Sequence, residues 1–128
     1  MLLTAIGFND NCHEAINFYK TTLGAEVKQL NKAGDDPDNG GDYPPDFVMY
    51  SEVSLFGTTI VMCDGIDTPK EGFWLQVMFN TPQEVIDVFN KLADGGVVTA
   101  PPEPAFWAAM NANVKDRFGV EWNILTNS

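Results

Sequence analysis

Two stretches of this chain, EAINFY at residues 14–19 and FGTTIV at residues 56–61, return later in looser form. EVIDVF lies 70 positions after the first stretch, at residues 84–89, and FGVEWN lies 62 positions after the second, at residues 118–123. In each half, the pattern of an amphipathic helix precedes glycine-rich turns, and a Phe-Gly turn then leads into an apolar strand. Two copies of this length are too long and too few for a solenoid. The repeat therefore predicts one supersecondary unit that is used twice.

The size and charge of the chain limit its partners. Its 128 residues suffice for a single domain with a buried core, and 45% of them are hydrophobic. Eighteen acidic against seven basic side chains give a net charge of −11. A surface this negative repels phosphate backbones and anionic lipids. We therefore expect neither nucleic acid nor a membrane surface as a partner.

The cysteines and the first residues of the chain bear on its compartment. Cys12 and Cys63 are too few and too far apart for a disulfide framework or a CxxC metal knuckle. We expect both to be thiols in a reducing compartment. Residues 1–8 lack the basic region of a signal peptide and are too short to span a membrane. The prediction is a cytoplasmic location.

The first half is predicted to contain one helix among four strands. Asn9 or Asn11 caps the helix, and Gly24 ends it. Residues 31–46 are rich in glycine, proline and aspartate, which predicts a loop and makes this segment the candidate lid of a binding site. The expected strands cover residues 2–8, 26–30, 47–55 and 58–63.

The second half repeats this plan after a linker at residues 65–71. Thr81 caps its helix, Pro82 takes the first helical position, and two glycines follow the helix at residues 95–96. The expected strands cover residues 73–79, 97–100, 106–114 and 120–126, with the PPEP sequence of residues 101–104 as a stiff connector. We thus expect one domain of two tandem modules, residues 1–64 and 72–128, each with a strand, a helix and three strands.

This β-α-β-β-β repeat resembles the vicinal oxygen chelate superfamily, which includes glyoxalase, bleomycin-resistance proteins and extradiol dioxygenases. Three motifs look most like its PhnB-like branch: EAIxFY at 14–19, Phe106-Trp107, and DxFGxxW at 116–122. The resemblance implies an α+β fold in which two βαβββ modules form a cupped mixed sheet with the helices on its outer face. It also implies a homodimer, which some members of the superfamily form by exchanging modules. The exposed edges of such sheets favour a dimer on physical grounds as well.

Members of the superfamily commonly hold a divalent metal ion at four equivalent strand positions. Carried over through the motifs and the 70-residue offset, these positions fall on Thr4, Val61, Trp74 and Asn123. The usual ligands are His, Glu or Gln, whereas Val and Trp have no donor for a metal and Thr and Asn are weak neutral donors. We therefore expect no metal and no other cofactor.

An enzyme remains an open alternative. Gln76, Glu121 and Glu52 could form a different metal site, which would suit a lyase, an isomerase or a dioxygenase. Nucleophilic catalysis has less support, because the single histidine, His13, follows Cys12 directly and no triad can be recognised. The PhnB-like branch also carries a methyltransferase name, but the sequence has no glycine-rich nucleotide-binding turn.

Strand alternation predicts which side chains face the cleft. The cleft face is expected to carry Thr4, Ile6, Thr59, Val61, Cys63, Trp74, Gln76, Met78, Asn123 and Leu125. The opposite face is expected to pack under the helices with Leu75, Val77, Phe79, Val120, Trp122 and Ile124. Such a cleft is mostly apolar, with a few amides and hydroxyls, and suits a small apolar or aromatic ligand that stacks on Trp74. The leading hypothesis is a metal-free small-molecule-binding protein. A structural module whose cleft is filled by Trp74 and Met78 is the other alternative.

Overall fold

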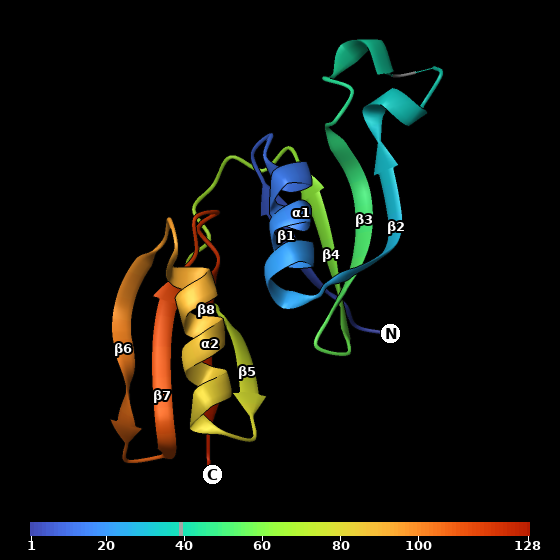
Figure 1. Cartoon of the computed structure of the whole chain (residues 1–128). Coiled ribbons are helices and arrows are strands. Elements are labelled where there is room, and N and C mark those ends of the chain that lie inside the picture. Colours follow the sequence, from blue (N-terminus) through green and yellow to red (C-terminus); the bar gives the residue numbers. More distant parts are fainter. Residues whose placement is uncertain (39) are drawn as a thin grey trace. The chain divides into compact units, whose positions relative to one another are not determined.

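The chain folds into two compact units, Met1–Thr68 and Pro69–Ser128, and their boundary falls within the predicted linker. The structure is a computed structural model that describes residues 1–38 and 40–128. Each unit has one long helix and a mixed sheet of four strands (Figure 1). The predicted α+β fold with two βαβββ modules is therefore confirmed.

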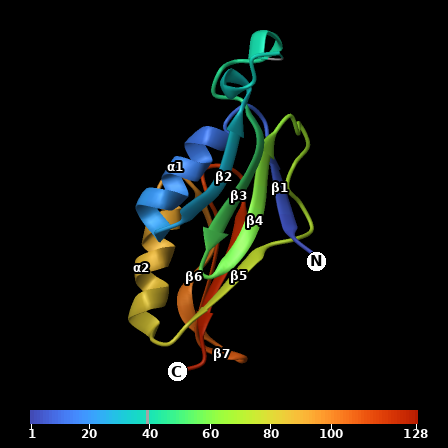
Figure 2. The ribbon, with the colours of Figure 1, turned by 90° about the vertical axis from the view of Figure 1, so that its right-hand side faces the viewer.

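The first unit packs its helix against one face of its sheet. The strand order is β1 (Thr4–Phe8), β4 (Thr58–Asp64), β3 (Val48–Leu55) and β2 (Glu26–Lys32), with β1 parallel to β4 and the other pairs antiparallel. Helix α1 (Cys12–Leu23) lies across this sheet in Figure 2. Ile16 and Tyr19 of α1 are buried with Val53, Ile60 and Met62 of the sheet, and together they form the core of this unit.

The second unit has the same topology. Its strand order is β5 (Leu75–Phe79), β8 (Glu121–Thr126), β7 (Ala108–Lys115) and β6 (Val97–Ala105), with β5 parallel to β8. Helix α2 (Pro82–Ala93) covers one face of the sheet. Val85, Phe89 and Leu92 of the helix are buried, as are Trp122 and Ile124 of the central strand β8.

The two helices begin in different ways. Thr81 caps α2 as predicted, because its side-chain oxygen accepts a hydrogen bond of 3.2 Å from the backbone N–H of Glu84, and Pro82 opens the helix. The side chain of Asn11, at the start of α1, makes no such bond. There Oδ1 of Asp64, at the end of β4, accepts the bond from Cys12 N–H at 3.0 Å, while its Oδ2 accepts one from Val48 N–H at 2.9 Å. The predicted asparagine cap is therefore wrong, because a distant carboxylate takes that role.

The secondary structure differs from the prediction in two segments of the second unit. Residues 101–104 belong to β6 and are not a connector. β6 is an edge strand, where proline is tolerated, and the register of its pairing with β7 shifts between Ala100 and Glu103, where Pro101 and Pro102 lie. The predicted strand over 106–114 begins later, at Ala108, because Phe106 and Trp107 form the turn between β6 and β7.

The segment predicted as a loop over residues 31–46 is partly structured. Its first two residues belong to β2, and 3-10 turns cover Ala33–Asp35 and Gly40–Asp42. Backbone hydrogen bonds close its base, from Ala33 N–H to the Phe47 carbonyl at 2.8 Å and from Gly34 N–H to the Pro45 carbonyl at 3.0 Å. Asn39 lies outside the described residues. A lid role for this segment stays a prediction.

The described residues contain no helix that could span a membrane. Neither α1 nor α2 is long and apolar enough to cross a bilayer.

Candidate functional site

The face of the second sheet opposite α2 carries a row of carboxamide side chains. Gln76 of β5 pairs with Asn123 of β8, and Asn123 pairs in turn with Asn113 of β7. Asn111 lies two residues before Asn113 and so shares its face of the sheet. We call Gln76, Asn111, Asn113 and Asn123 the amide row.

Hydrogen bonds within the amide row fix how its members are oriented. Nδ2 of Asn123 donates to Oδ1 of Asn111 at 2.8 Å and to Oδ1 of Asn113 at 2.6 Å. Both asparagines on β7 therefore turn their own N–H groups away from Asn123. The Nδ2 groups of Asn111 and Asn113 and the Oδ1 of Asn123 have no partner among the described residues, so they can bind a ligand or water.

Two tryptophans flank the amide row. Trp74 precedes β5 and is 58% exposed, and Trp107 in the β6–β7 turn is 65% exposed. The indole N–H of Trp74 lies 3.5 Å from Oε1 of Gln76. An exposed indole next to polar groups is a common way to hold a flat ring by stacking.

The amide row and these tryptophans line a hollow of about 440 Å³. This volume lies in the range of small-molecule sites, roughly 300 to 1,000 Å³. The lining residues are Trp74, Gln76, Thr99, Trp107, Asn111, Asn113, Val114, Glu121, Trp122 and Asn123.

The structure brings together only some of the predicted site residues of the second unit. Trp74, Gln76 and Asn123 line the hollow, whereas Met78 and Leu125 pair with each other on the same face beyond it. Met78 is 56% exposed, so it does not fill a core. The predicted opposite face is confirmed for Val120, Trp122 and Ile124, which are all buried in the core.

In the first unit, the predicted face is correct for β4 and wrong for β1. Val61 and Cys63 pair with Ala5 and Gly7 on the face away from α1. Thr59 lies on that same face, two residues before Val61. Thr4 and Ile6 instead pair with Ile60 and Met62 on the helix-covered face, where Ile6 is only 1% exposed.

The cause of this error is a difference in loop length. Three residues, 9–11, connect β1 to α1, but only residues 80–81 connect β5 to α2. The offset of 70 that relates the helices therefore becomes 71 in the first strands, and the pairing makes Ala5 the counterpart of Gln76. Thr4 was therefore predicted one residue too early for this position and Trp74 two residues too early, which is why Trp74 still shares the face of Gln76.

The positions where the superfamily places its metal ligands do not suit a metal ion here. With the corrected register they are Ala5 and Val61 in the first unit and Gln76 and Asn123 in the second. The side chains of the first pair have no donor atom. The second pair offers two neutral amides, of which only Gln76 is a ligand type that the superfamily uses, and two such donors are too few for a divalent ion. Within the described ranges, no group of three or more His, Cys, Asp or Glu side chains could hold a metal ion.

The alternative metal set is divided between the two units. Gln76 and Glu121 line the same hollow in the second unit. Glu52 belongs to β3 of the first unit, where its Oε2 accepts a hydrogen bond of 2.8 Å from the hydroxyl of Tyr50. This bond, with smaller effects of burial and of the charge of Glu52, raises the pKa of Tyr50 above its ordinary value.

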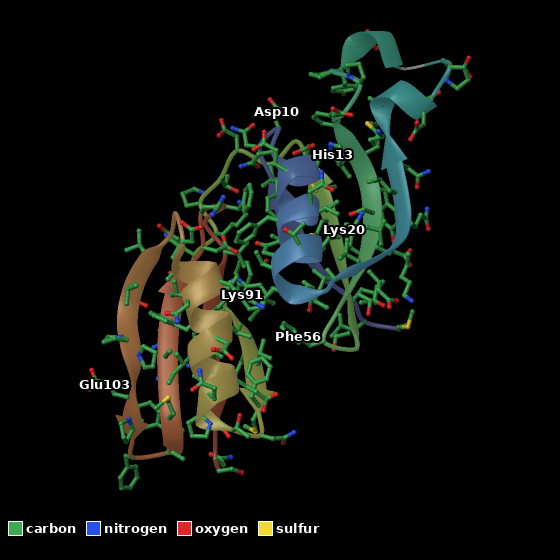
Figure 3. The ribbon with its side chains drawn as sticks, in the orientation of Figure 1. Asp10, His13, Lys20, Phe56, Lys91 and Glu103 are labelled. Atoms are coloured by element: carbon green, nitrogen blue, oxygen red, sulfur yellow. The ribbon has the colours of Figure 1, made fainter. Side chains whose placement is uncertain are left out.

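The first unit has a smaller hollow of about 120 Å³ at the start of α1. Asp10, His13 and Asp46 lie in its wall, and Figure 3 shows Asp10 and His13 at this end of the helix. Nδ1 of His13 is 3.8 Å from Oδ2 of Asp46. The volume of this hollow is below that of typical ligand sites.

Sequence reasoning missed five residues of the larger hollow: Thr99, Trp107, Asn111, Asn113 and Val114. A usable signal was present in the NAN sequence of residues 111–113, whose two amides alternate with a buried alanine. Fixing the parity of β7 by its pairing with β8 would have placed both amides beside Asn123.

Comparisons with known proteins agree with this fold. A sequence model of the family described as 3-demethylubiquinone-9 3-methyltransferase matches residues 1–125. The chain is 29% identical to Protein YjdN of Escherichia coli K12 over 132 residues, which cover 93% of this chain and 90% of YjdN.

Solved structures show the same arrangement. Protein PA1353 from Pseudomonas aeruginosa superposes with a TM-score of 0.85 at 28% identity, with 98% of this chain and 96% of that chain covered. The PhnB protein from Bacillus cereus gives 0.81 at 23% identity, with 98% of both chains covered.

The fold extends to a more distant protein, a glyoxalase/bleomycin resistance protein/dioxygenase family enzyme from Burkholderia phytofirmans. Its TM-score is 0.70 at 13% identity, with 98% of this chain and 97% of that chain covered. The chain thus has the fold of the PhnB protein and of the glyoxalase/bleomycin resistance protein/dioxygenase family enzyme. Because the family model spans nearly all of the sequence, the chain belongs to the 3-demethylubiquinone-9 3-methyltransferase family.

Proposed function

We propose that this protein binds a small aromatic molecule, without a metal ion, in the hollow on the open face of the second sheet. The observation that carries the proposal is the amide row flanked by Trp74 and Trp107. A site of this kind combines apolar walls with a few directional polar groups, as small-molecule sites generally do.

The tryptophan and asparagine side chains have different roles in this proposed recognition. The indoles of Trp74 and Trp107 offer faces on which a ring can stack. The unused amide groups of Asn111, Asn113 and Asn123 can then fix the orientation of that ring by hydrogen bonds. This composition is more polar than the mostly apolar cleft predicted from the sequence.

The proposed independence of metal rests on the chemistry of the available donors. Gln is one of the superfamily's usual ligands, but Gln76 with the weak neutral donor Asn123 falls short of the three or more protein donors that a divalent site needs. Metal content of untagged protein, followed by titration with Ni, Zn, Mn and Fe(II), tests this part. We expect no stoichiometric binding, and tight binding of one ion per chain would overturn it.

Binding itself can be tested with a library of small aromatic compounds, detected by tryptophan fluorescence and by NMR. For any compound that binds, Trp74→Ala should weaken the affinity by about 1–3 kcal/mol because a stacking surface is lost. Phe56→Ala is the matched control, since Phe56 is an exposed aromatic at the β3–β4 turn of the first unit (Figure 3). Equal affinity in wild type and Trp74→Ala would remove Trp74 from the site.

A metal-dependent lyase, isomerase or dioxygenase is the second candidate. The observation in its favour is that Gln76 and Glu121 line the same hollow and could supply two oxygen donors. If metal titration finds a bound ion, Glu121→Gln should release it, because the only carboxylate in the lining is lost.

Two other functions have less support. A structural module with a filled cleft would need Trp74 and Met78 to be buried, yet each is more than half exposed. A methyltransferase, the activity in the family's description, needs a site for a methyl donor. The sequence has no glycine-rich turn of the kind that binds such nucleotides, so we do not propose that activity.

We also propose a homodimer in the cytoplasm. Each sheet has two edge strands, and those at β1, β2 and β5 contain no proline that would prevent pairing with another chain. Both cysteines are thiols, which suits a reducing compartment. Light scattering coupled to size-exclusion chromatography tests the dimer, and a mass of 14.1 kDa at all concentrations would contradict it.

A further inference from the structure

We infer that the ligand is a neutral, planar ring with an amide edge, in which a carbonyl and an N–H lie side by side. This inference rests on the proposed function, since it names the chemical class that the hollow of the second unit would accept. Cyclic amides, imides and ureas have such an edge.

The hydrogen-bonding capacity of the amide row leads to this class. Asn111 and Asn113 each accept a hydrogen bond from Asn123 through Oδ1, so the groups that they have left without any bond are their N–H donors. Carbonyl oxygens of a ligand would satisfy these donors. Asn123 keeps its Oδ1 as an acceptor, which calls for an N–H on the ligand.

Donors and an acceptor therefore lie next to each other in one row. A lactam edge presents the complementary pair of groups, in the way that Asn and Gln side chains read the paired donor and acceptor of a base edge. A ligand with acceptors alone would leave Oδ1 of Asn123 without a partner once water is displaced, and that loss disfavours it.

The charge of the lining disfavours anions. Glu121 is the only charged side chain among the residues that line the hollow, and it is acidic. A carboxylate or phosphate on the ligand would meet this negative charge, with no arginine or lysine in the lining to balance it. Glu121 can also accept a hydrogen bond from a neutral ligand N–H.

The flanking tryptophans favour a flat ligand. Trp74 and Trp107 come from opposite margins of the sheet, before β5 and between β6 and β7, and both line the hollow. A planar ring can lie against an indole while its edge meets the amides.

Four ring compounds separate the alternatives in titrations of the 128-residue protein, measured by tryptophan fluorescence and ligand-observed NMR. Uracil has the amide edge, 1,3-dimethyluracil keeps the carbonyls but has no N–H, orotate adds a carboxylate, and benzene has only the ring. We expect uracil to bind and the other three to bind at least about tenfold more weakly. Dimethyluracil and benzene lose hydrogen bonds, and the carboxylate of orotate is repelled by Glu121.

Two variants and a control test whether the preference for uracil arises at the amide row. Asn113→Ala should weaken uracil about tenfold, because one N–H donor is removed. Glu121→Gln should reduce the difference between the affinities for orotate and for uracil. Asn90→Ala, an exposed asparagine on the opposite side of the unit in α2, should leave all affinities unchanged. Circular dichroism confirms that each variant is folded.

The results also separate this inference from the proposed function. Dimethyluracil or benzene binding as tightly as uracil, or orotate binding more tightly, overturns the ligand class but leaves small-molecule binding in place. Failure of all four to bind overturns the class as well. If the wider aromatic library then also gives no compound whose binding responds to Trp74→Ala, the proposed function falls with it.

Discussion

The indole N–H of Trp122 donates a hydrogen bond of 2.9 Å to Oδ2 of Asp116, a carboxylate that is only 3% exposed. The other oxygen of Asp116 accepts from the backbone N–H of Phe118 at 2.9 Å and of Val120 at 3.1 Å. One side chain thus holds the turn before β8 and fixes the largest residue of the core under α2. The family motif DxFGxxW at residues 116–122 therefore has a structural basis in this chain.

Replacing Asp116 with alanine should lower the free energy of unfolding by about 2–4 kcal/mol. The substitution removes three hydrogen bonds and leaves buried N–H donors without an acceptor, each of which costs roughly 1–3 kcal/mol before the structure relaxes. Urea denaturation followed by circular dichroism measures the change.

Asp94→Ala is the matched control for this experiment. Asp94 forms an ion pair of 3.3 Å with Arg117, but its side chain is largely exposed. Exposed pairs contribute about 0–1 kcal/mol, so this variant should stay near wild type. If the two variants were equally stable, the role assigned to the Asp116 carboxylate would be wrong.

Replacing Trp122 and replacing Trp107 should change the stability of the protein by very different amounts. Trp122 is 2% exposed in the core of the second unit, and Trp122→Ala should cost about 3–5 kcal/mol of stability through the cavity it leaves. Trp107→Ala removes a solvent-exposed ring and should change stability by less than about 1 kcal/mol. Thermal melting of both variants measures this difference in stability. A wild-type melting temperature for Trp122→Ala would contradict the assignment of Trp122 to the helix-covered face of β8.

The sequence predicted the second unit better than the first, for a physical reason. In β8, buried Trp122 and Ile124 alternate with Glu121 and Asn123, so the period of two can be read from the sequence alone. In β1 nearly every residue is apolar, so the sequence pattern does not show which residues face the helix. The face of each residue was therefore assigned from the offset between the two helices. One extra residue before α1 was enough to shift that offset and to exchange the two faces of β1.

The amide row shows a different limit of sequence reasoning. Asn123 was identified through the repeat, but its partners Asn111 and Asn113 come from a neighbouring strand whose register no local pattern fixes. The cap of α1 was missed for the same reason, since Asp64 lies 52 residues from Cys12 in the sequence. Contacts between strands and helix ends that are distant in sequence therefore account for most of what was missed.

A methyl group at Gly7 should destabilise the first unit. A Cβ at this position would overlap the side chain of Ile66, which folds back over β1 and donates a backbone hydrogen bond of 3.0 Å to the carbonyl of Phe8. Displacing Ile66 should cost about 1–3 kcal/mol, as overpacking usually does. Gly41→Ala, where the added carbon meets open space, is the control. Chemical denaturation of the two variants should separate them, and equal stability would mean that Ile66 does not pack on Gly7.

The Tyr50–Glu52 pair predicts a pH effect whose sign can be worked out. The hydrogen bond to the Glu52 carboxylate favours the neutral phenol, so the pKa of Tyr50 lies above its ordinary value of 10.0. A raised pKa in the folded state means that the stabilisation from this pair is complete below pH 10.0 and is lost as the pH rises through the raised pKa. Glu52→Gln should bring the titration of Tyr50 back toward its ordinary value, and Tyr50→Phe identifies its signal among the three tyrosines. Phenolate absorption as a function of pH measures this, and an unchanged titration in Glu52→Gln would show that the carboxylate is not the cause.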